Sequence, residues 1–404
     1  MSEDIRHSLH SRSVLAGYDP ARLASARVLV AGLGALGQNI LQTLALSGVG
    51  RFLLVDFDEF EEHNATRSPF FPSPADRLRF GGRKAPCVAH RALAVSTAED
   101  PEIRYCETTV QRAGDGCVRW ADVVVSAVDG VETRIWLAER ARLHGKPLVE
   151  GGFSGPEYNF SAFSGEAGAN CYRCFNPAVF SSMSCRQYAT EAARRRIVPA
   201  IQATASVLGG MMAEQVMNLL HGDHSAYGYR FSGDIRRGTF QRSNLLPSHR
   251  CPGEHDPLPV RPAPEDLPEP RTVADLLQIV RKQLTAGWIV PSETVVLAAP
   301  CTRCGTICQV RAGESEWRRG PRCAGCGGVW PPADGRSPGL ALMIDIDAEP
   351  DPDLAATALA DIGVRPGGHV LVAPADGDRY LLELPGDPAA AWPLAVAEAV
   401  TSLC

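Results

Sequence analysis

Long apolar runs are absent from this 404-residue sequence, which nowhere contains a stretch of twenty consecutive apolar residues. A helix that crosses a bilayer needs about 20 of them, so the sequence predicts no membrane-spanning helix and no membrane partner. The opening residues, MSEDIRHSLHSR, also lack the apolar centre of a secretion signal. We therefore expect a cytoplasmic protein.

An excess of positive charge is absent as well. The chain carries 40 Lys and Arg residues against 46 Asp and Glu residues, which gives a formal net charge of −6 at pH 7. Binding of nucleic acid through the overall field of a protein requires the opposite sign. The composition therefore argues against a nucleic-acid partner, while the length allows two domains with separate cores.

Cysteine, by contrast, is plentiful, with 13 residues. In a long chain without a signal segment, cysteines paired as C-x-x-C are better interpreted as metal ligands and thiols than as disulfides. The last two of three such pairs are separated by the spacing of a zinc ribbon, so we expect them to hold a structural Zn²⁺. The three pairs are Cys171 and Cys174, Cys301 and Cys304, and Cys323 and Cys326.

The stretch 27–67 predicts a nucleotide-binding strand, loop and helix. Residues 27–31 form an apolar run typical of a buried strand, and residues 38–47 have the pattern of an amphipathic helix. Between them lies a G-x-G-x-x-G turn, whose glycines let the backbone turn tightly and approach a phosphate at the helix N-terminus. These glycines are Gly32, Gly34 and Gly37.

Asp56 ends the next predicted strand, over 52–55, at about twenty residues beyond the last glycine. A carboxylate at this place can accept both ribose hydroxyls of a nucleotide. These features fit a nicotinamide-dependent dehydrogenase equally well. A triphosphate is favoured by the polar and cationic residues that follow, for which a dehydrogenase has no need: Asp58, Asn64 and Arg67.

At these residues the chain resembles the ThiF/MoeB and ubiquitin-activating superfamily. The superfamily pattern after the second strand is D-x-D, then N, then R three residues later, and the four polar residues just named have that spacing. Ala35 stands where a glycine is usual, and Ser68-Pro69 replaces a glutamine. The resemblance implies an ATP-dependent adenylyltransferase with a Rossmann-like, mostly parallel α/β sheet.

The resemblance also implies a role for each polar group near the nucleotide. The glycine turn would admit ATP, Asp56 would hold the ribose, and Asp58 would help to bind Mg²⁺. Asn64 and Arg67 would neutralise phosphates. Lys84, in the superfamily's G-x-x-K pattern, would join them from the start of a helix, where an ordinary exposed lysine is the alternative.

Asp129 and Arg12 complete the predicted catalytic set. Asp129 follows an apolar strand over 121–127, and a carboxylate at the end of a parallel strand faces the crevice where ligands bind. It is our candidate Mg²⁺ ligand. The superfamily pattern here is D-N-x-x-x-R; Gly130 replaces its asparagine, whereas its aspartate and arginine are present as Asp129 and Arg134. The resemblance implies a homodimer in which Arg12 reaches into the partner's active site; a solvated charge is the alternative.

Cys171 and Cys174 match the superfamily's C-Y-x-C motif, which implies a second structural Zn²⁺ site. The resemblance places the other two ligands after the last long helix, here predicted over 200–221. The candidates at that place are Cys251 and His255, with histidine where cysteine is common. Such a site would join two distant loops around one ion.

Cys185 has no C-x-x-C companion. In the superfamily, a cysteine that follows the metal pair accepts the activated carboxyl group as a thioester, or enters a persulfide or acyl-disulfide step. Nearby arginines, Arg186 and residues 194–196, could favour its thiolate form. The alternative is a small buried hydrophobic residue without a chemical role.

Residues 257–270, PLPVRPAPEDLPEP, contain six prolines and predict an extended linker. The resemblance ends just before it, near residue 255. We expect an adenylation domain with an N-terminal arm over 1–256, and a smaller C-terminal α+β domain over 271–404. The smaller domain would carry the zinc ribbon and end in a helix near 390–403.

The predicted function is ATP-dependent adenylation of the C-terminal carboxylate of a small ubiquitin-like or sulfur-carrier protein. Transfer of the activated group to a cysteine thiol would follow. One alternative is adenylation of a ribosomal precursor peptide in natural-product biosynthesis. Another is a non-catalytic scaffold subunit of a heterodimeric activating enzyme, which would have no need for so many polar groups around a triphosphate.

Overall fold

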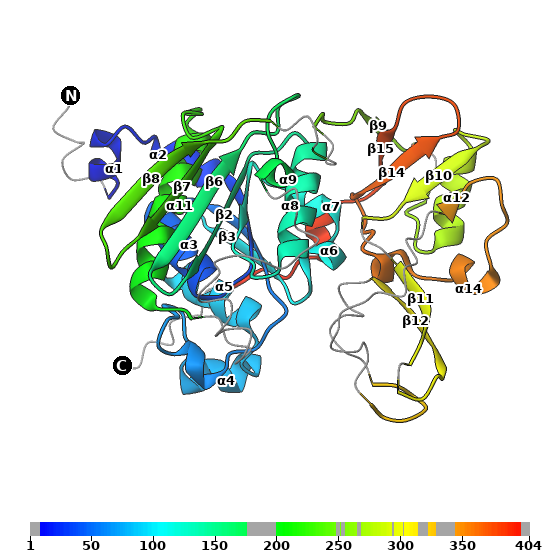
Figure 1. The fold of residues 1–404 in the computed structure, drawn as a ribbon, viewed down its shortest axis with the longest axis horizontal. Coiled ribbons are helices and arrows are strands. Elements are labelled where there is room, and N and C mark those ends of the chain that lie inside the picture. The colour runs from blue at the N-terminus through cyan, green and yellow to red at the C-terminus, as the bar shows by residue number, and fades with distance from the viewer. Residues whose placement is uncertain are drawn as a thin grey trace. The chain divides into compact units, whose positions relative to one another are not determined.

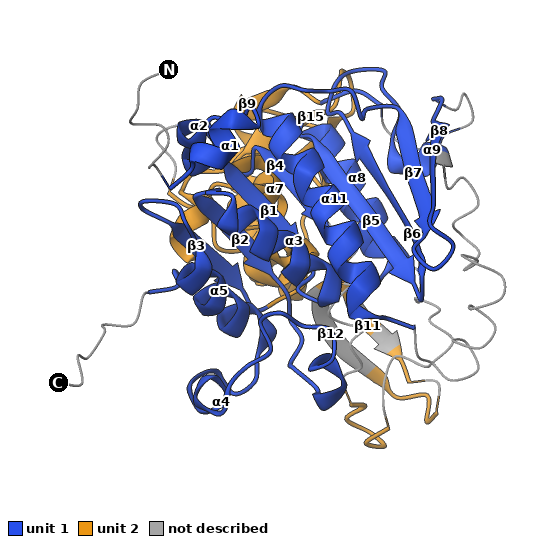
Figure 2. Cartoon of the chain, turned by 90° about the vertical axis from the view of Figure 1, so that its left-hand side faces the viewer, with its two compact units in different colours: residues 1–107, 121–257, 392–404 blue, residues 108–120, 258–391 orange. Residues whose placement is uncertain are grey.

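The structure is a computed structural model of the chain, and it describes residues 9–175, 199–247, 251, 255–264, 268–292, 295–301, 303–313, 322–328 and 344–396. Two compact units are present (Figure 2): residues 1–107, 121–257 and 392–404 make unit 1, and residues 108–120 and 258–391 make unit 2. Both units are discontinuous in sequence. The division expected at residues 257–270 stays a prediction about independently folding domains.

Unit 1 is built on an eight-stranded sheet (Figure 1). Its strands are β1 (Arg27–Ala31), β2 (Arg51–Val55), β3 (Glu102–Cys106), β4 (Val123–Ser126), β5 (Leu148–Ser154), β6 (Glu157–Phe163), β7 (Tyr229–Asp234) and β8 (Thr239–Asn244). Its helices are α1 (Ser11–Leu15), α2 (Pro20–Ser25), α3 (Ala35–Leu46), the 3₁₀ turn η2 (Glu62–Asn64), α4 (Pro74–Phe80), α5 (Lys84–Val95), α8 (Val131–Leu143), α9 (Tyr172–Phe175) and α11 (Gln202–Leu220).

The strand order is β3-β2-β1-β4-β5-β6-β7-β8. The first five strands are parallel, and β6, β7 and β8 continue the sheet antiparallel. From β1 the chain runs outward on one side through β2 and β3, then returns to build the other side from β4. This reversal between β1 and β4 is where open α/β sheets bind ligands. The predicted Rossmann-like, mostly parallel sheet is confirmed.

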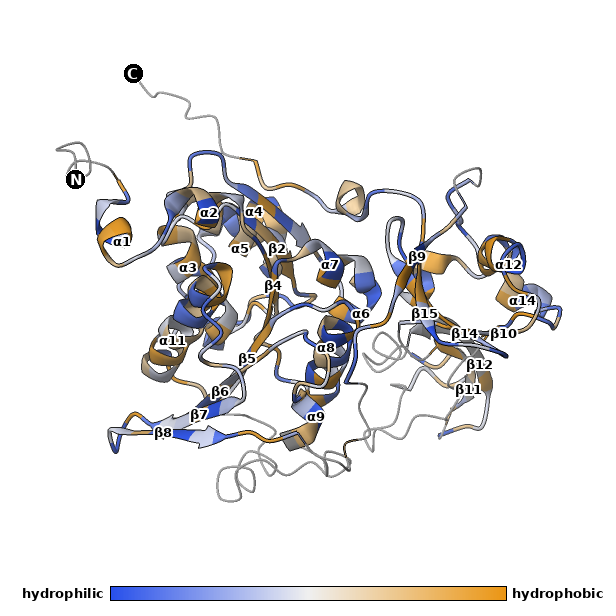
Figure 3. Ribbon diagram, turned by 90° about the horizontal axis from the view of Figure 1, so that it is seen from above, coloured by the Kyte–Doolittle hydropathy of each residue, from blue (hydrophilic) through white to orange (hydrophobic). Residues whose placement is uncertain are grey.

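The core of unit 1 follows from the apolar central strands, which are coloured hydrophobic in Figure 3. Successive side chains of a strand point to opposite faces. One face, with Val30, Leu54 and Val125, packs in a single cluster with residues of α3, α5 and α11. Helix α8 packs against β4 and β5. Burial of both faces explains why these strands read as continuous apolar runs.

Unit 2 contains a five-stranded sheet in the order β13-β10-β14-β15-β9 and a separate hairpin, β11-β12. Its strands are β9 (Val260–Pro262), β10 (Gly287–Val290), β11 (Val295–Pro300), β12 (Ile307–Gly313), β13 (Ile344–Asp345), β14 (His369–Pro374) and β15 (Tyr380–Glu383). Its helices and 3₁₀ turns are α6 (Val110–Ala113), α7 (Asp115–Trp120), α12 (Val273–Arg281), α14 (Pro352–Ala355), η3 (Leu359–Ile362) and η4 (Pro388–Ala391). The smaller α+β unit is therefore present as predicted.

The end of the described chain differs from the expected helix near 390–403. After η4, the amide of Ala395 donates to the carbonyl of Ile103 at 2.8 Å, and Leu394 pairs with Arg104 in an antiparallel bridge. Pro393 disfavours a helical conformation at the residue before it, and the edge of β3 offers unpaired backbone groups. The helix prediction is wrong over 392–396, and residues 397–404 lie outside the described part of the chain.

No helix among the described residues is both long and apolar enough to span a bilayer.

The contact between α11 and α3 gives a direct test of this packing. A Cβ added at Gly209 would lie 2.7 Å from the Cβ of Asn39 on α3, whereas a Cβ at Gly210 would meet no atom within 4 Å. We expect Gly209→Ala to destabilise unit 1 by about 1–3 kcal/mol through overpacking. Gly210→Ala should stabilise it by roughly 0.5–1 kcal/mol, since alanine is the better helix former. Urea unfolding of the two variants measures both; effects of equal sign would contradict this packing.

Candidate active site and metal centre

The glycine turn after β1 is shaped by three different constraints. Gly32 has a φ of +88°, and a Cβ there would lie 2.7 Å from the carbonyl oxygen of Ala127. A Cβ on Gly37 would lie 1.9 Å from the carbonyl oxygen of Gly32. Gly34, at the N-cap of α3, has nothing within 4 Å of its Cβ position and makes no side-chain cap. The turn is therefore closed at Gly32 and Gly37 and open at Gly34, where a phosphate could approach the helix N-terminus.

Asp56 lies beside this turn at the end of β2. Its carboxylate accepts a hydrogen bond from the amide of Leu33 at 2.6 Å and another from the amide of Asp58 at 2.8 Å. Burial raises the pKa of Asp56, and the charge of Lys84 opposes that rise. The predicted ribose carboxylate is thus tied to the backbone of the glycine turn itself.

Lys84 lies at the start of α5 and is nearly buried. Its Nζ is 2.9 Å from Oδ2 of Asp58, and its amide donates to the carbonyl of Asp58 at 2.8 Å. These contacts join the predicted phosphate cation to one of the predicted Mg²⁺ carboxylates. The structure therefore brings Asp56, Asp58, Lys84 and the glycine turn to one end of the sheet.

Asn64 and Arg67 make local contacts instead. Oδ1 of Asn64 accepts from the amide of Glu61 at 3.0 Å and so caps the short 3₁₀ turn η2. Nη1 of Arg67 donates to the carbonyl of His63 at 2.8 Å. Their proposed contact with phosphates stays a prediction.

The other predicted catalytic residues are placed as follows. Asp129 is exposed on the loop that joins β4 to α8, directly after the strand that borders β1. Arg12 is exposed on α1, and its action on a partner subunit stays a prediction. Cys185 lies outside the described residues.

Gln38, the first polar residue after the glycine turn, was not predicted from the sequence to belong to the site. Gln38 is fully buried; its Nε2 donates to the carbonyl of Leu33 at 2.8 Å, and its Oε1 accepts from the amide of Phe70 at 3.0 Å. The side chain thereby fixes the glycine turn to the segment that follows Arg67. The available signal was a polar residue directly after the last glycine of the turn, at the start of the helix.

Glu150, a buried carboxylate on β5, was also not predicted from the sequence. Nη1 of Arg134 donates to Oε2 of Glu150 at 3.0 Å, and Nε of Arg134 donates to the carbonyl of Val128 at 2.9 Å. Burial raises the pKa of Glu150, and the charge of Arg134 opposes that rise. The available signal was a charged residue inside a predicted strand, since Glu150 is the third residue of β5, although this signal does not reveal its partner.

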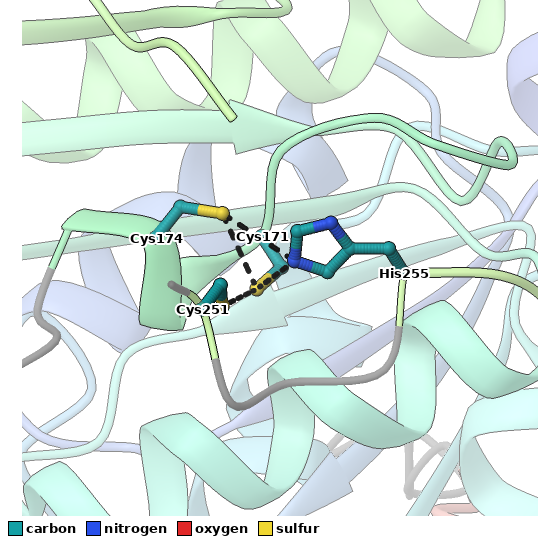
Figure 4. Close-up of side chains that lie close together, drawn as sticks. All are labelled: Cys171, Cys174, Cys251 and His255. Carbon is teal, nitrogen blue, oxygen red and sulfur yellow. Dashed lines mark hydrogen bonds between the residues drawn. The ribbon is translucent and has the colours of Figure 1, made fainter. Parts of the chain in front are cut away.

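Four predicted ligands of the first metal site converge in unit 1 (Figure 4). Sγ of Cys171 lies 3.9 Å from Sγ of Cys174 and 3.5 Å from Sγ of Cys251. Nε2 of His255 is 3.6 Å from Sγ of Cys171 and 3.5 Å from Sγ of Cys174. An ion held tetrahedrally about 2.3 Å from each sulfur keeps the sulfurs about 3.8 Å apart, so the spacing and the donor set fit zinc.

Arg142 joins the two halves of this cluster. Its guanidinium is buried and donates to the carbonyl of His255 at 3.1 Å. It also donates to the carbonyls of Glu166, of Ala169 at 2.9 Å and of Asn170 at 2.6 Å, in the segment that leads to Cys171. Burial lowers the pKa of Arg142, while the nearby cysteines and Asp256 counteract this shift. A metal centre with several thiolates would therefore have a fixed positive charge beside it.

The second group of cysteines lies in unit 2, next to the β11-β12 hairpin. Sγ of Cys301 lies 3.8 Å from Sγ of Cys326, and Sγ of Cys304 lies 3.7 Å from Sγ of Cys323. These four sulfurs lie close enough together to share one ion. Their spacing fits tetrahedral zinc as well as the first cluster does.

The fold and the glycine turn define a Rossmann-like α/β protein, with a cluster of Cys and His side chains that could hold a metal ion. A sequence model of the ThiF family matches residues 11–253, which is more than half of the chain. The chain belongs to the ThiF family, and this confirms the resemblance stated above.

Several curated proteins are similar to this chain. The sulfur carrier protein adenylyltransferase of Thermus thermophilus is 30% identical over 240 residues, covering 57% of this chain and 83% of that protein. The adenylyltransferase and sulfurtransferase MOCS3 of Sus scrofa is 31% identical over 236 residues, covering 55% of this chain and 47% of that protein. The MOCS3 protein of Mus musculus is 33% identical, with 46% of its length covered. The chain thus matches about half the length of the MOCS3 relatives.

Among solved structures, E. coli MccB crystallised with ATP is similar to this fold. The TM-score is 0.51 with 18% sequence identity, and the match covers 63% of this chain and 76% of that chain. At this level of identity the likeness concerns the fold alone.

The two clusters predict the metal content of the purified protein. We expect two zinc ions per chain, one lost on Cys171→Ser and the other on Cys301→Ser, because each cluster then keeps only three of its four ligands. Cys106→Ser, at a cysteine outside both clusters, is the matched control and should retain two ions. Elemental analysis measures the stoichiometry; one ion per wild-type chain would contradict the assignment of one cluster.

Proposed function

We propose that this protein is an ATP-dependent adenylyltransferase that activates the C-terminal carboxylate of a small ubiquitin-like or sulfur-carrier protein. The observation that carries the proposal is the open, uncapped N-terminus of α3 beside the half-buried Asp56 and the Asp58–Lys84 pair. A helix N-terminus with free amides favours an anion, and the lysine adds a positive charge. The ThiF family membership and the adenylyltransferase names of its relatives support the choice.

In the proposed reaction, a carboxylate oxygen of the carrier attacks the α-phosphate of ATP. A new O–P bond forms, the bond to the leaving pyrophosphate breaks, and a mixed acyl-adenylate remains. The carboxylate is already ionised near neutral pH, so no general base is needed. Catalysis then depends on positioning and on stabilising phosphate charge.

The residues divide by charge in this proposal. Lys84, Arg67 and Asn64 would bind phosphate oxygens, and Arg12 of a second subunit would add a further cation in a homodimer. Mg²⁺, when bound, neutralises phosphate charge, and Asp58 and Asp129 are the carboxylates that would hold it. Zinc would occupy both cysteine clusters in a structural role, because all four ligands at each site come from the protein.

The alternative substrate, a ribosomal precursor peptide, would use the same nucleotide site. The sequence relatives named above are adenylyltransferases whose names also contain a sulfur carrier protein or a sulfurtransferase. These names favour a carrier protein over a precursor peptide as the substrate. A scaffold subunit remains the less favoured alternative, because Asp58 and Lys84 stay paired beside an open glycine turn.

Pyrophosphate exchange tests the proposed activity. The purified protein, given a carrier protein with a C-terminal Gly-Gly, should exchange labelled pyrophosphate into ATP. Asp129→Ala should lower the exchange rate by roughly 100-fold or more, because a Mg²⁺ ligand is lost. Asp223→Ala, at an exposed carboxylate on the loop after α11, is the matched control and should exchange normally. Full exchange by Asp129→Ala would overturn the assignment of Asp129.

A second experiment separates adenylation from transfer to a thiol. If Cys185 accepts the activated acyl group, Cys185→Ala should exchange pyrophosphate at the wild-type rate, since adenylation precedes the thiol step. The same variant should form no thiol-sensitive adduct with the carrier on a non-reducing gel. An adduct formed by the variant at the wild-type level would show that Cys185 is not the acceptor.

A further inference from the structure

Arg134 lies in the first turn of α8, just beyond the loop that carries Asp129. Its Nε donates to the carbonyl of Val128, the residue before Asp129, at 2.9 Å. Its Nη1 donates to Glu150 of β5 at 3.0 Å. A hydrogen bond from Arg134 also opposes the rise that burial causes in the pKa of the Tyr172 hydroxyl. One guanidinium therefore joins the Asp129 loop, the sheet and the segment of Tyr172.

Glu150 gives this guanidinium a fixed anchor. The Glu150 side chain is 6% exposed and the Arg134 side chain 16% exposed, and Glu150 stands opposite Ser126 in the register of β4 and β5. Gly152 makes room for the group, since a Cβ there would lie 2.7 Å from Nη2 of Arg134. The guanidinium of Arg134 can donate two parallel hydrogen bonds and is held by the carboxylate of Glu150, so it has little freedom to move.

Tyr172 belongs to the metal centre by its place in the chain. It stands between the ligands Cys171 and Cys174, in the short helix α9, and its side chain is buried. Its hydrogen bond to Arg134 thus connects the ligand loop of the first metal cluster to the residue that holds Val128.

The segment around Cys171 and Cys174 contacts α8 at two further places. Nε of Arg173 lies 2.6 Å from Oε1 of Glu139, in the middle of α8. At the end of α8, Arg142 binds the carbonyls of the segment before Cys171 and the carbonyl of His255. The segments that carry the ligands therefore contact α8 at its middle and at its end, and Arg134 contacts the Asp129 loop at the start of α8.

We propose that the first metal centre positions Asp129 for Mg²⁺, through Tyr172 and the positioning residue Arg134. This inference deepens the proposed function and rests on it for the role of Asp129. Cys171, Cys174, Cys251 and His255 would order the segment of Tyr172 against α8 when they hold a metal ion. The Tyr172 hydroxyl and Glu150 then hold Arg134 in the geometry in which it fixes the Val128 carbonyl, and with it the direction of Asp129.

Binding of Mn²⁺ together with an ATP analogue that has a methylene between its α- and β-phosphates tests the inference without turnover. Electron paramagnetic resonance measures free Mn²⁺ in the presence of the 404-residue, zinc-loaded chain. We expect Tyr172→Phe to keep its zinc and its melting temperature but to bind Mn²⁺ roughly 10-fold more weakly, as is typical for the loss of an outer-sphere partner. Tyr105→Phe, on β3 at the other edge of the sheet, is the matched control and should bind as the wild type does.

Arg142→Gln tests the same connection from its far end, since it leaves every ligand and Arg134 in place. We expect zinc release to a chromogenic chelator to be roughly 10-fold faster, and Mn²⁺ binding to weaken as zinc is lost.

Wild-type Mn²⁺ affinity in Tyr172→Phe, or in Arg142→Gln after zinc loss, would overturn the inference. A wild-type chain that binds Mn²⁺ with the analogue but exchanges no pyrophosphate would contradict the proposed function alone. No Mn²⁺ binding at all would contradict both.

Discussion

The close approach of Gly37 to the carbonyl of Gly32 is the contact on which the candidate site of unit 1 depends. A single methyl group at Gly37 would lie 1.9 Å from that oxygen, and one at Gly32 would lie against the backbone of Ala127. Only glycine at both places lets α3 start this close to β1 and β4. The same geometry leaves the N-terminus of α3 open at Gly34, beside Asp56. The closed turn and the open helix end are two results of one constraint.

A second constraint acts at the other end of α8, where residues distant in sequence meet around the first metal cluster. Cys171 and Cys174 come from one segment, and Cys251 and His255 from another about 80 residues away, as the separation of Cys171 from Cys251 shows. Closing so long a loop costs conformational entropy, and bound metal would offset that cost with folding free energy. Arg142 reinforces the closure by binding carbonyls of both segments. Helix α8 thus has a second structural role besides covering the sheet, because its Arg142 joins the two segments that carry the metal ligands.

The sequence predicted those parts of the site that local patterns encode. The glycine turn, the strand that ends at Asp56 and the C-x-x-C pairs depend on residue type and short spacing, and the structure places them as expected. Glu150 and Arg142 escaped prediction because their partners lie far along the chain or are backbone carbonyls, which no side-chain pattern reveals. The extended segment after η4 escaped for a similar reason, since pairing with β3 is a long-range contact that overrides a weak helical pattern.

The central claim, that the open turn at Gly34 binds the phosphates of ATP, is tested most directly by ATP titration of Gly34→Asp in a calorimeter. Gly34 has an extended conformation at the N-cap of α3, which suits aspartate, so the variant should be as stable as the wild type or more stable. Its carboxylate would cap the amides that phosphate needs and would repel the nucleotide, so ATP affinity should fall by roughly 10-fold or more. Gly34→Asn, which caps without charge, should lose less affinity. Wild-type ATP affinity in a stable Gly34→Asp variant would contradict the account.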